Sequence, residues 1–532
     1  MEEQYIVSHD LGTSADKAIL ITVHGEIIDI AKKTYSIYHP HPGFAEQNPD
    51  DWWDAVCKTT QEVVKKTKVD PKKIVGMTFS SQMQGLVPVS KDGTPLMNAM
   101  TWLDSRAADI INSKLWKQPK IAGYNPRNLI KFLTITGGCP GHHGKDQVGK
   151  ILWLHEYEPE IFHNTYKFLD VKDYVIYKLT NRMVTSIDLA YVWWLMDTRN
   201  YKYEWNKSLC RLAGITPEKL PELRSSAEIV GQITAEAAKK TGLKQGTPII
   251  NGAGDMSSAA IGSGAIDEGE LHINLGTSNW VAGHVRKRKI DIQHYAGCVG
   301  SAYPREYYLA TAHQETAGVC LEWLKNNIFL KLGTNASLNS DGLDFYQRLD
   351  ALAEQSEPGS RNLLFTPWMY GERTPLDDDF VRAGFYNLSL KHDVTHLARA
   401  VLEGIAFNTR WAKQIIEKLY QPVEHLNIIG GGARSKVWCQ IMADVCNRTI
   451  HQVKHPQQAG ARGIALIASL TLGCIDDYKN IKNFIEIENS FYPNQKNRKL
   501  YDDLFNFYKQ IYRNNKKWFS KINSWVTNKE AM

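Results

Sequence analysis

Apolar runs that end in glycine and hydroxyl residues recur along this chain and alternate with segments of helical periodicity. Tyr5–Val7 precedes the tetrapeptide Leu11–Ser14, and Leu271–Ile273 precedes an identical tetrapeptide at Leu275–Ser278. The alternation of the two patterns predicts an α/β fold. Further strands are predicted at residues 18–23, 74–80, 247–251 and 426–429, and helices at residues 49–69, 314–327 and 393–420.

The repeated tetrapeptide Leu-Gly-Thr-Ser is typical of a loop that binds phosphate. Glycine lets the backbone approach an anion closely, and the amides and hydroxyls that follow can donate to its oxygens. Because one copy stands in each half of the chain, the repeat predicts two similar lobes with a nucleotide held between them. The cofactor-binding candidates in and beside the loops are Gly12, Thr13, Ser14, Lys17, Gly276, Thr277 and Ser278.

An acidic residue, Asp10, stands directly before the first of these loops. A carboxylate cannot bind phosphate itself, but it can hold a hydrated Mg²⁺ that the phosphates also ligate. Lys17 is placed to neutralise charge on a transferred phosphoryl group. Asp10 is therefore a candidate for metal binding and catalysis, and the competing interpretation is a capped surface turn.

A second acidic residue, Asp255, follows two glycines near the middle of the chain, just after the strand predicted at residues 247–251. A carboxylate there would point into a cleft between the lobes and take the proton from an attacking hydroxyl, a general-base role worth roughly 10²–10⁴-fold in rate. The competing interpretation is an N-cap for a helix that begins near Ser257. Taken alone, the local sequence favours the cap.

Three consecutive glycines follow the strand predicted at residues 426–429. Gly430, Gly431 and Gly432 let the backbone lie flat against a ring or a ribose, and Ser435 follows closely. The spacing differs from the GxGxxG pattern of dinucleotide-binding loops. It predicts an adenosine-binding turn that uses Gly431, Gly432 and Ser435, against the alternative of a simple strand-to-helix connection.

Two short polar segments in the first half of the chain suit a polyhydroxylated ligand. Amide and carboxylate groups bind hydroxyls, while a tryptophan ring packs on C–H faces. The alternative is a surface ion pair between Asp104 and Arg106 beside a core tryptophan. The substrate-binding candidates here are Gln82, Met83, Gln84, Trp102, Asp104 and Arg106.

Length and composition narrow the class of protein. The chain has 532 residues, of which 43% are hydrophobic and 23% charged, as in a globular protein with two large domains. Its longest nearly apolar stretch, Ile464–Ile475, is too short to span a bilayer. No signal peptide is visible, and the eight cysteines form no CxxC pair. These features predict a cytoplasmic protein with buried thiols and no membrane partner.

An exposed loop is predicted at residues 332–343.

The net charge of +6 is concentrated at the C-terminal end. Residues 479–532 contain eleven Lys and Arg against five Asp and Glu, so the rest of the chain is balanced. This distribution argues against a nucleic-acid-binding body. Helical spacing of the apolar residues predicts an amphipathic helix that packs on the body, with a basic face for an acidic partner as the alternative. The residues with this spacing are Tyr501, Leu504, Phe505, Tyr508, Ile511 and Tyr512.

Taken in order, these motifs resemble those of the FGGY family of carbohydrate kinases, and within it the xylulokinases (pentulose kinases). The resemblance covers roughly residues 4–475. The matching segments are 10–17 (first phosphate motif), 44–53, 102–106 (sugar side), 252–255 (catalytic aspartate), 275–278 (second phosphate motif), 371–375, 384–404 and 430–435 (adenosine).

The resemblance implies an actin-like, ribonuclease H-like fold of two α/β lobes with an ATP and sugar cleft between them. It also implies a sugar-binding lobe at residues 1–250, a nucleotide-binding lobe at 251–490 and a basic helical tail at 491–532. Mg-ATP would be the phosphoryl donor and a small-molecule sugar the acceptor. By position, Asp255 would be the general base and Asp10 the carboxylate beside Mg²⁺, while the phosphate and adenosine contacts would come from Thr13, Ser14, Gly276, Thr277, Gly431 and Gly432.

The reaction that the resemblance favours converts D-xylulose to D-xylulose 5-phosphate. Two residues on the sugar side depart from the xylulokinase pattern, because Gln84 replaces a histidine and Met256 replaces an asparagine. Met256 is thus a further substrate-binding candidate. The departures leave another ketose, a polyol or a sugar acid open as the acceptor. An actin-like ATPase and a catalytically silent sugar-binding regulator are further alternatives. The oligomeric state stays open and includes a homodimer.

Overall fold

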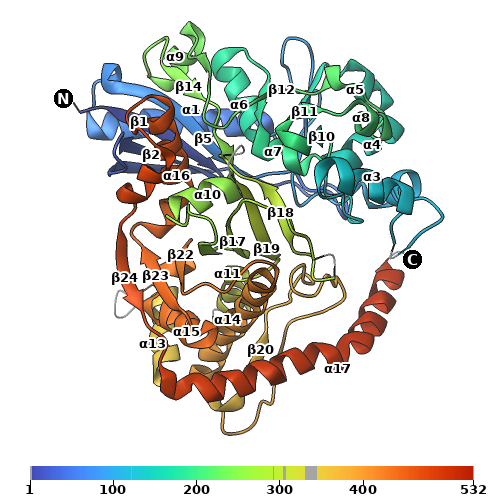
Figure 1. Ribbon diagram of the computed structural model, residues 1–532, viewed down its shortest axis with the longest axis vertical. Coiled ribbons are helices and arrows are strands. Elements are labelled where there is room, and N and C mark those ends of the chain that lie inside the picture. The colour runs from blue at the N-terminus through green and yellow to red at the C-terminus, as the bar shows by residue number, and fades with distance from the viewer. Residues whose placement is uncertain (1–2, 122, 292, 304–306, 330–343, 531–532) are drawn as a thin grey trace.

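Two mixed β-sheets form the centres of two lobes, one above the other in Figure 1. The computed structural model describes residues 3–121, 123–291, 293–303, 307–329 and 344–530, and each sheet has seven strands within this part. The loop expected at residues 332–343 lies outside these ranges. The first sheet contains β1 (Tyr5–Leu11), β2 (Ala15–Thr22), β3 (Ile27–Thr34), β5 (Ile74–Ser81), β13 (Ile229–Gln232), β14 (Pro248–Ile250) and β15 (Ala253–Gly254). The second contains β16 (Leu271–Leu275), β17 (Asn279–Val285), β18 (Gly297–Gly300), β19 (Tyr308–Gln314), β22 (His425–Ile429), β23 (Thr449–Val453) and β24 (Ile487–Phe491).

The two sheets repeat one topology. In the first, β1, β2 and β3 are antiparallel neighbours, and β5 and then β14 continue the sheet in parallel with β1. In the second, β16, β17 and β19 are antiparallel, and β22 and then β23 run parallel to β16. The two Leu-Gly-Thr-Ser segments therefore occupy equivalent turns, between β1 and β2 and between β16 and β17. The predicted two-lobed α/β fold is confirmed.

Helices cover both sheets. In the first half of the chain they include α1 (Pro49–Thr67), α2 (Ala108–Ile110), α3 (Pro126–Thr136), α4 (Gln147–Tyr157), α5 (Pro159–Asn164), α6 (Val171–Thr180), α7 (Ile187–Val192), α8 (Lys207–Leu212) and α9 (Ala235–Thr241). In the second half they include α10 (Asp255–Gly262), α11 (Gly318–Leu324), α13 (Phe345–Gln355), α14 (Val394–Leu419), α15 (Lys436–Cys446), α16 (Ala459–Thr471) and α17 (Arg498–Glu530).

Local sequence explains where several helices begin. Asn48 caps α1, because its side chain accepts a hydrogen bond from Asp50 N at 3.1 Å, and Pro49 follows at the first helical position. The helix predicted at residues 49–69 is confirmed. The helix predicted from residue 314 begins only at Gly318, because β19 continues through Gln314 in its pairing with β17.

The lobes meet where α10 crosses α16. Although α16 comes late in the sequence, it packs on the first sheet, and Ser8 Oγ on β1 donates to Ala461 O at 2.7 Å. The crossing is a close backbone contact. A Cβ added at Gly262 would lie 1.7 Å from Ala459 O, and one added at Gly463 would lie 2.1 Å from Ser258 O. Only glycine fits at these two positions, so the angle between the two helices is tightly set.

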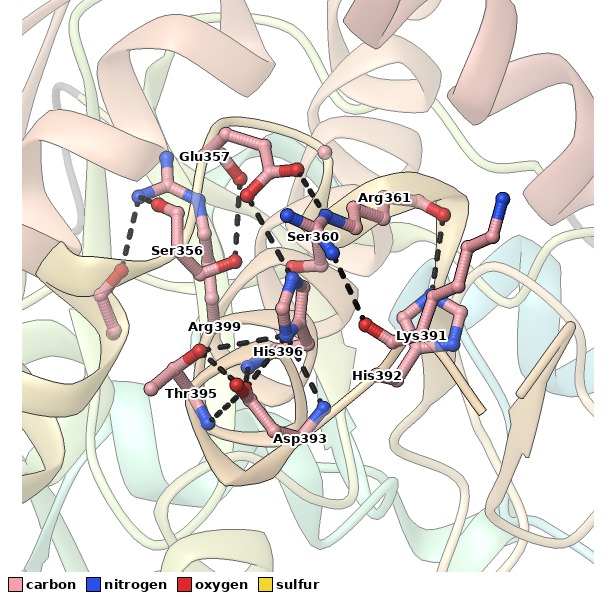
Figure 2. Close-up of polar contacts among 12 residues, drawn as sticks. Ser356, Glu357, Ser360, Arg361, Lys391, His392, Asp393, Thr395, His396 and Arg399 are labelled. Atoms are coloured by element: carbon pink, nitrogen blue, oxygen red, sulfur yellow. Dashed lines mark hydrogen bonds and ion pairs between the residues drawn. The ribbon is translucent and has the colours of Figure 1, made fainter. Parts of the chain in front are cut away.

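The long helix α14 begins in a dense set of polar contacts (Figure 2). Asp393 caps the helix, accepting from the amides of Thr395 and His396 at 3.0 and 3.4 Å. One turn further, Arg399 Nε donates to Glu403 Oε1 at 2.7 Å, and both side chains are almost fully buried. This buried pair lies in the core of the second lobe.

Helix α17 continues the same core. Its apolar face packs on the second lobe, with Tyr501, Leu504, Phe505 and Tyr508 all at most 4% exposed. The amphipathic helix predicted from their spacing is confirmed. Tyr501 also completes the pair on α14, because its hydroxyl donates to Glu403 Oε1 at 2.7 Å.

Two further expectations can be compared with the structure. All eight cysteines are free thiols, and six of them are buried. None of the helices in the described part of the chain combines the length and apolar character that a membrane crossing requires.

We expect Tyr501→Phe to lower the free energy of unfolding by about 1–3 kcal/mol, because it removes one hydrogen bond to Glu403 and leaves the buried Arg399 Nη2 without its partner. Urea denaturation monitored by circular dichroism would measure the change. The matched control is Tyr492→Phe, because Tyr492 is 69% exposed. Equal midpoints for the two variants would contradict a stabilising role for the Tyr501 hydroxyl.

Candidate active site

Two carboxylates, those of Asp10 and Asp255, lie at neighbouring strand ends of the first sheet, near the crossing of α10 and α16. Asp10 lies near the end of β1, where its Oδ1 accepts from Ser80 Oγ at 3.2 Å and its Oδ2 lies 3.4 Å from Lys17 Nζ. Asp255 is the first residue of α10, and its Oδ1 accepts from Met256 N at 2.8 Å. Burial, followed by repulsion from Asp10, raises the pKa of Asp255 to about 7.

This electrostatic setting suits proton transfer. A general base works best when its pKa lies near the working pH, because it is then ionised and still binds a proton strongly.

The position of Asp255 is fixed by Asp188, which sequence reasoning did not single out. Asp188 is fully buried on α7, and its Oδ2 accepts from Gly254 N at 2.7 Å. Asp188 gives little local signal, because it becomes relevant only when α7 packs beside Gly254.

The two phosphate-loop candidates are open turns at equivalent sheet positions. In the first, Ser14 is exposed, while Thr13 Oγ1 accepts from Trp102 Nε1 at 2.9 Å. In the second, Thr277 is exposed, and Gly276 lies against the start of α11. A Cβ added at Gly318 would lie 2.6 Å from Gly276 O, so the second loop and α11 are in close backbone contact.

The triple-glycine turn adjoins the second loop. Gly430 has a φ of +92°, and a Cβ there would lie 2.6 Å from Leu275 O. Gly431 is open, with only the Gln457 amide within contact distance of an added Cβ. Ser435, predicted as a nucleotide contact, is the N-cap of α15, because its Oγ accepts from Trp438 N at 2.9 Å. The turn and the second loop thus form one glycine-lined surface, which fits a nucleotide.

The carboxylates also fit a magnesium ion bound through phosphates. The described residues include no group of three His, Cys, Asp or Glu side chains that could hold a metal by themselves. Mg²⁺ usually keeps several waters and binds through one or two carboxylates plus substrate phosphates. Asp10, beside the first loop, is suited to that role.

The sugar-side candidates divide into two groups. The first group directly follows β5 and comprises Gln82, Met83 and Gln84. Gln82 Nε2 donates to Gln47 Oε1 at 2.9 Å. Met83 packs against Gly254, where an added Cβ would lie 2.8 Å from the Met83 sulfur. Gln84 has a φ of +63°. Met256 packs in the same apolar cluster as Met83.

Asp104 and Arg106 instead form a buried ion pair. Arg106 Nε lies 3.0 Å from both Asp104 oxygens, its NH2 donates to Glu46 Oε1 at 2.6 Å, and its guanidinium lies 3.6 Å from the Phe44 ring centroid. Their side chains are 0% and 2% exposed. The pair therefore stabilises the loop that carries Trp102.

A small polar pocket lies between the lobes. Gln84 is the one sequence candidate among the described residues that line it. The first lobe contributes Gln84, Gly141, His143, Lys145 and Asp146, and the second contributes Tyr295, Glu315, Tyr370, Glu372, Arg373, Asp377 and Asp379. Sequence reasoning noted residues 371–375 only as a matching segment, and it missed Lys145 and Asp146.

Asp146 organises the first-lobe side of the pocket. Its Oδ1 accepts from Gln84 Nε2 at 3.0 Å and from Trp194 Nε1 at 2.7 Å, while its Oδ2 accepts from Gly141 N at 2.8 Å. The bonds from Trp194 and Gly141 hold the Asp146 carboxylate, which in turn orients the Gln84 amide. The carbonyl oxygen of Gln84 is thereby oriented as well, and it is the remaining polar atom of that side chain.

Charge on the second-lobe side is paired. Arg373 lies 2.6 Å from Glu315, and although burial alone would raise the pKa of Glu315, Arg373 and Lys145 lower it to about 2. Burial raises the pKa of Glu372 to about 8 and lowers the pKa of Lys145. His143 lies 3.2 Å from Asp379, so an ion pair joins the two lobes at the pocket edge when His143 is protonated.

The chain matches two family models that together span most of its length. These are the N-terminal domain of the FGGY family of carbohydrate kinases at residues 5–262 and the C-terminal domain at residues 271–472. A xylulose kinase of Staphylococcus epidermidis is 31% identical over 524 residues, which is 97% of this chain and 98% of that protein.

Solved structures agree with the family models. A ligand-bound xylulose kinase from Lactobacillus acidophilus superposes with a TM-score of 0.85 at 28% identity, covering 98% of this chain and 100% of that one. A gluconate kinase from the same organism gives a TM-score of 0.84 at 29% identity with the same coverage. The chain therefore belongs to the FGGY family of carbohydrate kinases and is a sugar phosphotransferase.

Proposed function

We propose that this protein transfers the γ-phosphoryl group of Mg-ATP to D-xylulose and forms D-xylulose 5-phosphate. The observation that carries the proposal is the position of Asp255, with a pKa raised to about 7, at the lobe junction beside Asp10. In this mechanism Asp255 removes the proton from the attacking hydroxyl as the phosphoryl group transfers in line.

The remaining groups would hold the donor and lower its charge. The amides and hydroxyls of Thr13, Ser14, Thr277 and Ser278, with Gly12 and Gly276, would face the phosphates, and Gly431 with Gly432 would face the adenosine. Bound Mg²⁺ would neutralise phosphate charge. Lys17, whose ammonium lies 3.4 Å from Asp10, would add positive charge at the same place. Closing the lobes around the pocket would exclude water as a competing acceptor.

The chemistry of the pocket favours a neutral acceptor. Five carboxyl side chains line it, against one lysine and one arginine. Sugar hydroxyls can donate to carboxylates and accept from Lys145 and Arg373, so a neutral ketose satisfies both. An anionic acceptor would face repulsion from the ionised carboxylates, which outnumber Lys145 and Arg373.

A sugar acid is the second candidate, and Lys145 is the observation that favours it. Its side chain is largely buried, and no hydrogen bond or ion pair connects it directly to another described residue. A buried ammonium without a direct partner could pair with a carboxylate. The likeness to a gluconate kinase from Lactobacillus acidophilus gives D-gluconate as the compound to test.

We expect ADP release from Mg-ATP to be stimulated most by D-xylulose in a panel of ketopentoses, hexuloses, polyols and sugar acids. The reason is that a neutral polyhydroxylated chain matches the carboxylate-rich pocket. Stronger stimulation by D-gluconate would select the second candidate. ATP hydrolysis that no acceptor stimulates would select an actin-like ATPase, and sugar binding without ADP formation would select a silent regulator.

Asp255→Asn should lower kcat by roughly 10²–10⁴-fold, because an amide cannot accept the hydroxyl proton. The dissociation constant for ATP, measured by calorimetry, should stay within about twofold. Asp109→Asn is the matched control, because Asp109 is an exposed aspartate on α2. Parallel losses of ATP binding, melting temperature and turnover would instead identify Asp255 as a structural residue.

The pH profile offers an independent test. Below pH 7 the Asp255 carboxyl is mostly protonated and cannot act as a base, so kcat/KM for the acceptor should rise about tenfold per pH unit and level off above pH 7. Asp188→Asn removes a nearby negative charge that helps raise this pKa, so the midpoint should move to lower pH. A flat profile between pH 5 and pH 8 would contradict the assignment of Asp255.

A further inference from the structure

One segment supplies much of the second-lobe wall of the pocket. Residues 370–380, named here the wall segment, contribute Tyr370, Glu372, Arg373, Asp377 and Asp379 to the lining. The outer part of the wall segment is poorly buried, because Asp377, Asp379 and Phe380 are exposed. Its own packing therefore does little to fix the outer part in place.

Inside the wall segment, Asp378 and Glu372 are joined by backbone hydrogen bonds. Glu372 N donates to Asp378 O at 3.0 Å, and Asp378 N donates to Glu372 O at 2.8 Å. The Glu372 carboxyl in turn accepts from the amides of Glu315 and Arg373, both at 2.9 Å. The position of Asp378 is thus coupled to the charged residues of the pocket.

Helix α17 holds the wall segment from outside. Tyr512 Oη donates to Asp378 Oδ2 at 3.2 Å, and Asn523 Nδ2 donates to Phe380 O at 2.7 Å. Between them, Phe519 is 3% exposed and packs edge-on to Trp368, which lies just before the wall segment. Figure 1 shows α17 as the long helix that runs along the outside of the second lobe.

A second connection starts one turn earlier on α17. Tyr508 Oη donates to Asn408 Oδ1 at 3.2 Å, and Asn408 Nδ2 donates to Glu372 Oε2 at 2.6 Å. Helix α17 therefore reaches Glu372 by two routes, through Asn408 on α14 and through Asp378. None of the described α17 residues lines the pocket itself.

We infer that the second half of α17 positions the acceptor pocket, with Tyr512 and Asn523 acting as positioning residues through the wall segment. The inference rests on the proposed function, in which the interlobe pocket binds the acceptor. Helix α17 would then affect the affinity for the acceptor, in addition to covering the core of the second lobe.

The test compares the Tyr512→Phe/Asn523→Ala double variant with the matched control Asn514→Ala, in the full-length protein. Asn514 is an exposed residue on the same part of α17. We expect the KM for the acceptor to rise roughly 3- to 10-fold in the double variant, as the loss of two modest hydrogen bonds predicts. The KM for ATP, kcat and the melting temperature should change little, and the control should match the wild type.

Hydrogen exchange measured by mass spectrometry gives a readout that needs no substrate. Peptides that cover residues 370–380 should exchange several-fold faster in the double variant than in the control, because the outer hydrogen bonds are gone. If no compound stimulates the wild type, the proposed function fails, while the exchange data still decide whether α17 holds the wall segment. Unchanged hydrogen exchange at residues 370–380 would overturn the inference. An equal rise in the KM values for acceptor and ATP, together with a lower melting temperature, would overturn it too.

Discussion

The close crossing of α10 and α16 is the constraint on which the rest of the active site depends. Gly262 and Gly463 let the two backbones approach to distances that any side chain would prevent. Asp255 begins α10 directly after β15, which pairs with β5 beside β1, so the sheet register and the helix crossing together hold Asp255 near Asp10. The separation of the two carboxylates, and hence their mutual repulsion, is a consequence of backbone packing.

Electrostatics then separates the roles of the acidic groups. Burial and the charge of Asp10 raise the pKa of Asp255, whereas Arg373 and Lys145 overcome burial and keep Glu315 ionised. Glu372 is shifted upward because burial dominates there. Three acidic residues thus become the proposed proton acceptor (Asp255), an ion-pair partner (Glu315) and a buried hydrogen-bonding group (Glu372), and only their surroundings differ.

Parts of the molecule that look purely structural are connected to the pocket. The buried pair of Arg399 and Glu403 ties α17 to α14 through Tyr501. Further along, the same helix contacts the wall segment through Tyr512 and Asn523. A helix whose sequence indicates only an amphipathic tail therefore extends from the core of one lobe to the outer edge of the pocket.

The sequence by itself determined the local features. The paired Leu-Gly-Thr-Ser turns, the strands before them, the capped helix α1 and the apolar face of α17 follow from periodicity, capping residues and glycine, which act over a few residues. It also singled out Asp10 and Asp255 as candidates and placed the chain in its family by ordered motifs. These local features are present in the structure because short-range backbone preferences and burial patterns favour the same conformation.

Only the tertiary structure decided which distant residues meet. Asp188 behind Gly254, Lys145 and Asp146 opposite Glu315 and Arg373, and the burial of Asp104 with Arg106 could not be read from spacing. Charge interactions and desolvation depend on distances through space, and strand pairing and helix packing set those distances between segments far apart in the chain. For the same reason, residue types indicated a sugar kinase, while only the tertiary structure decided how charges are arranged around the interlobe pocket.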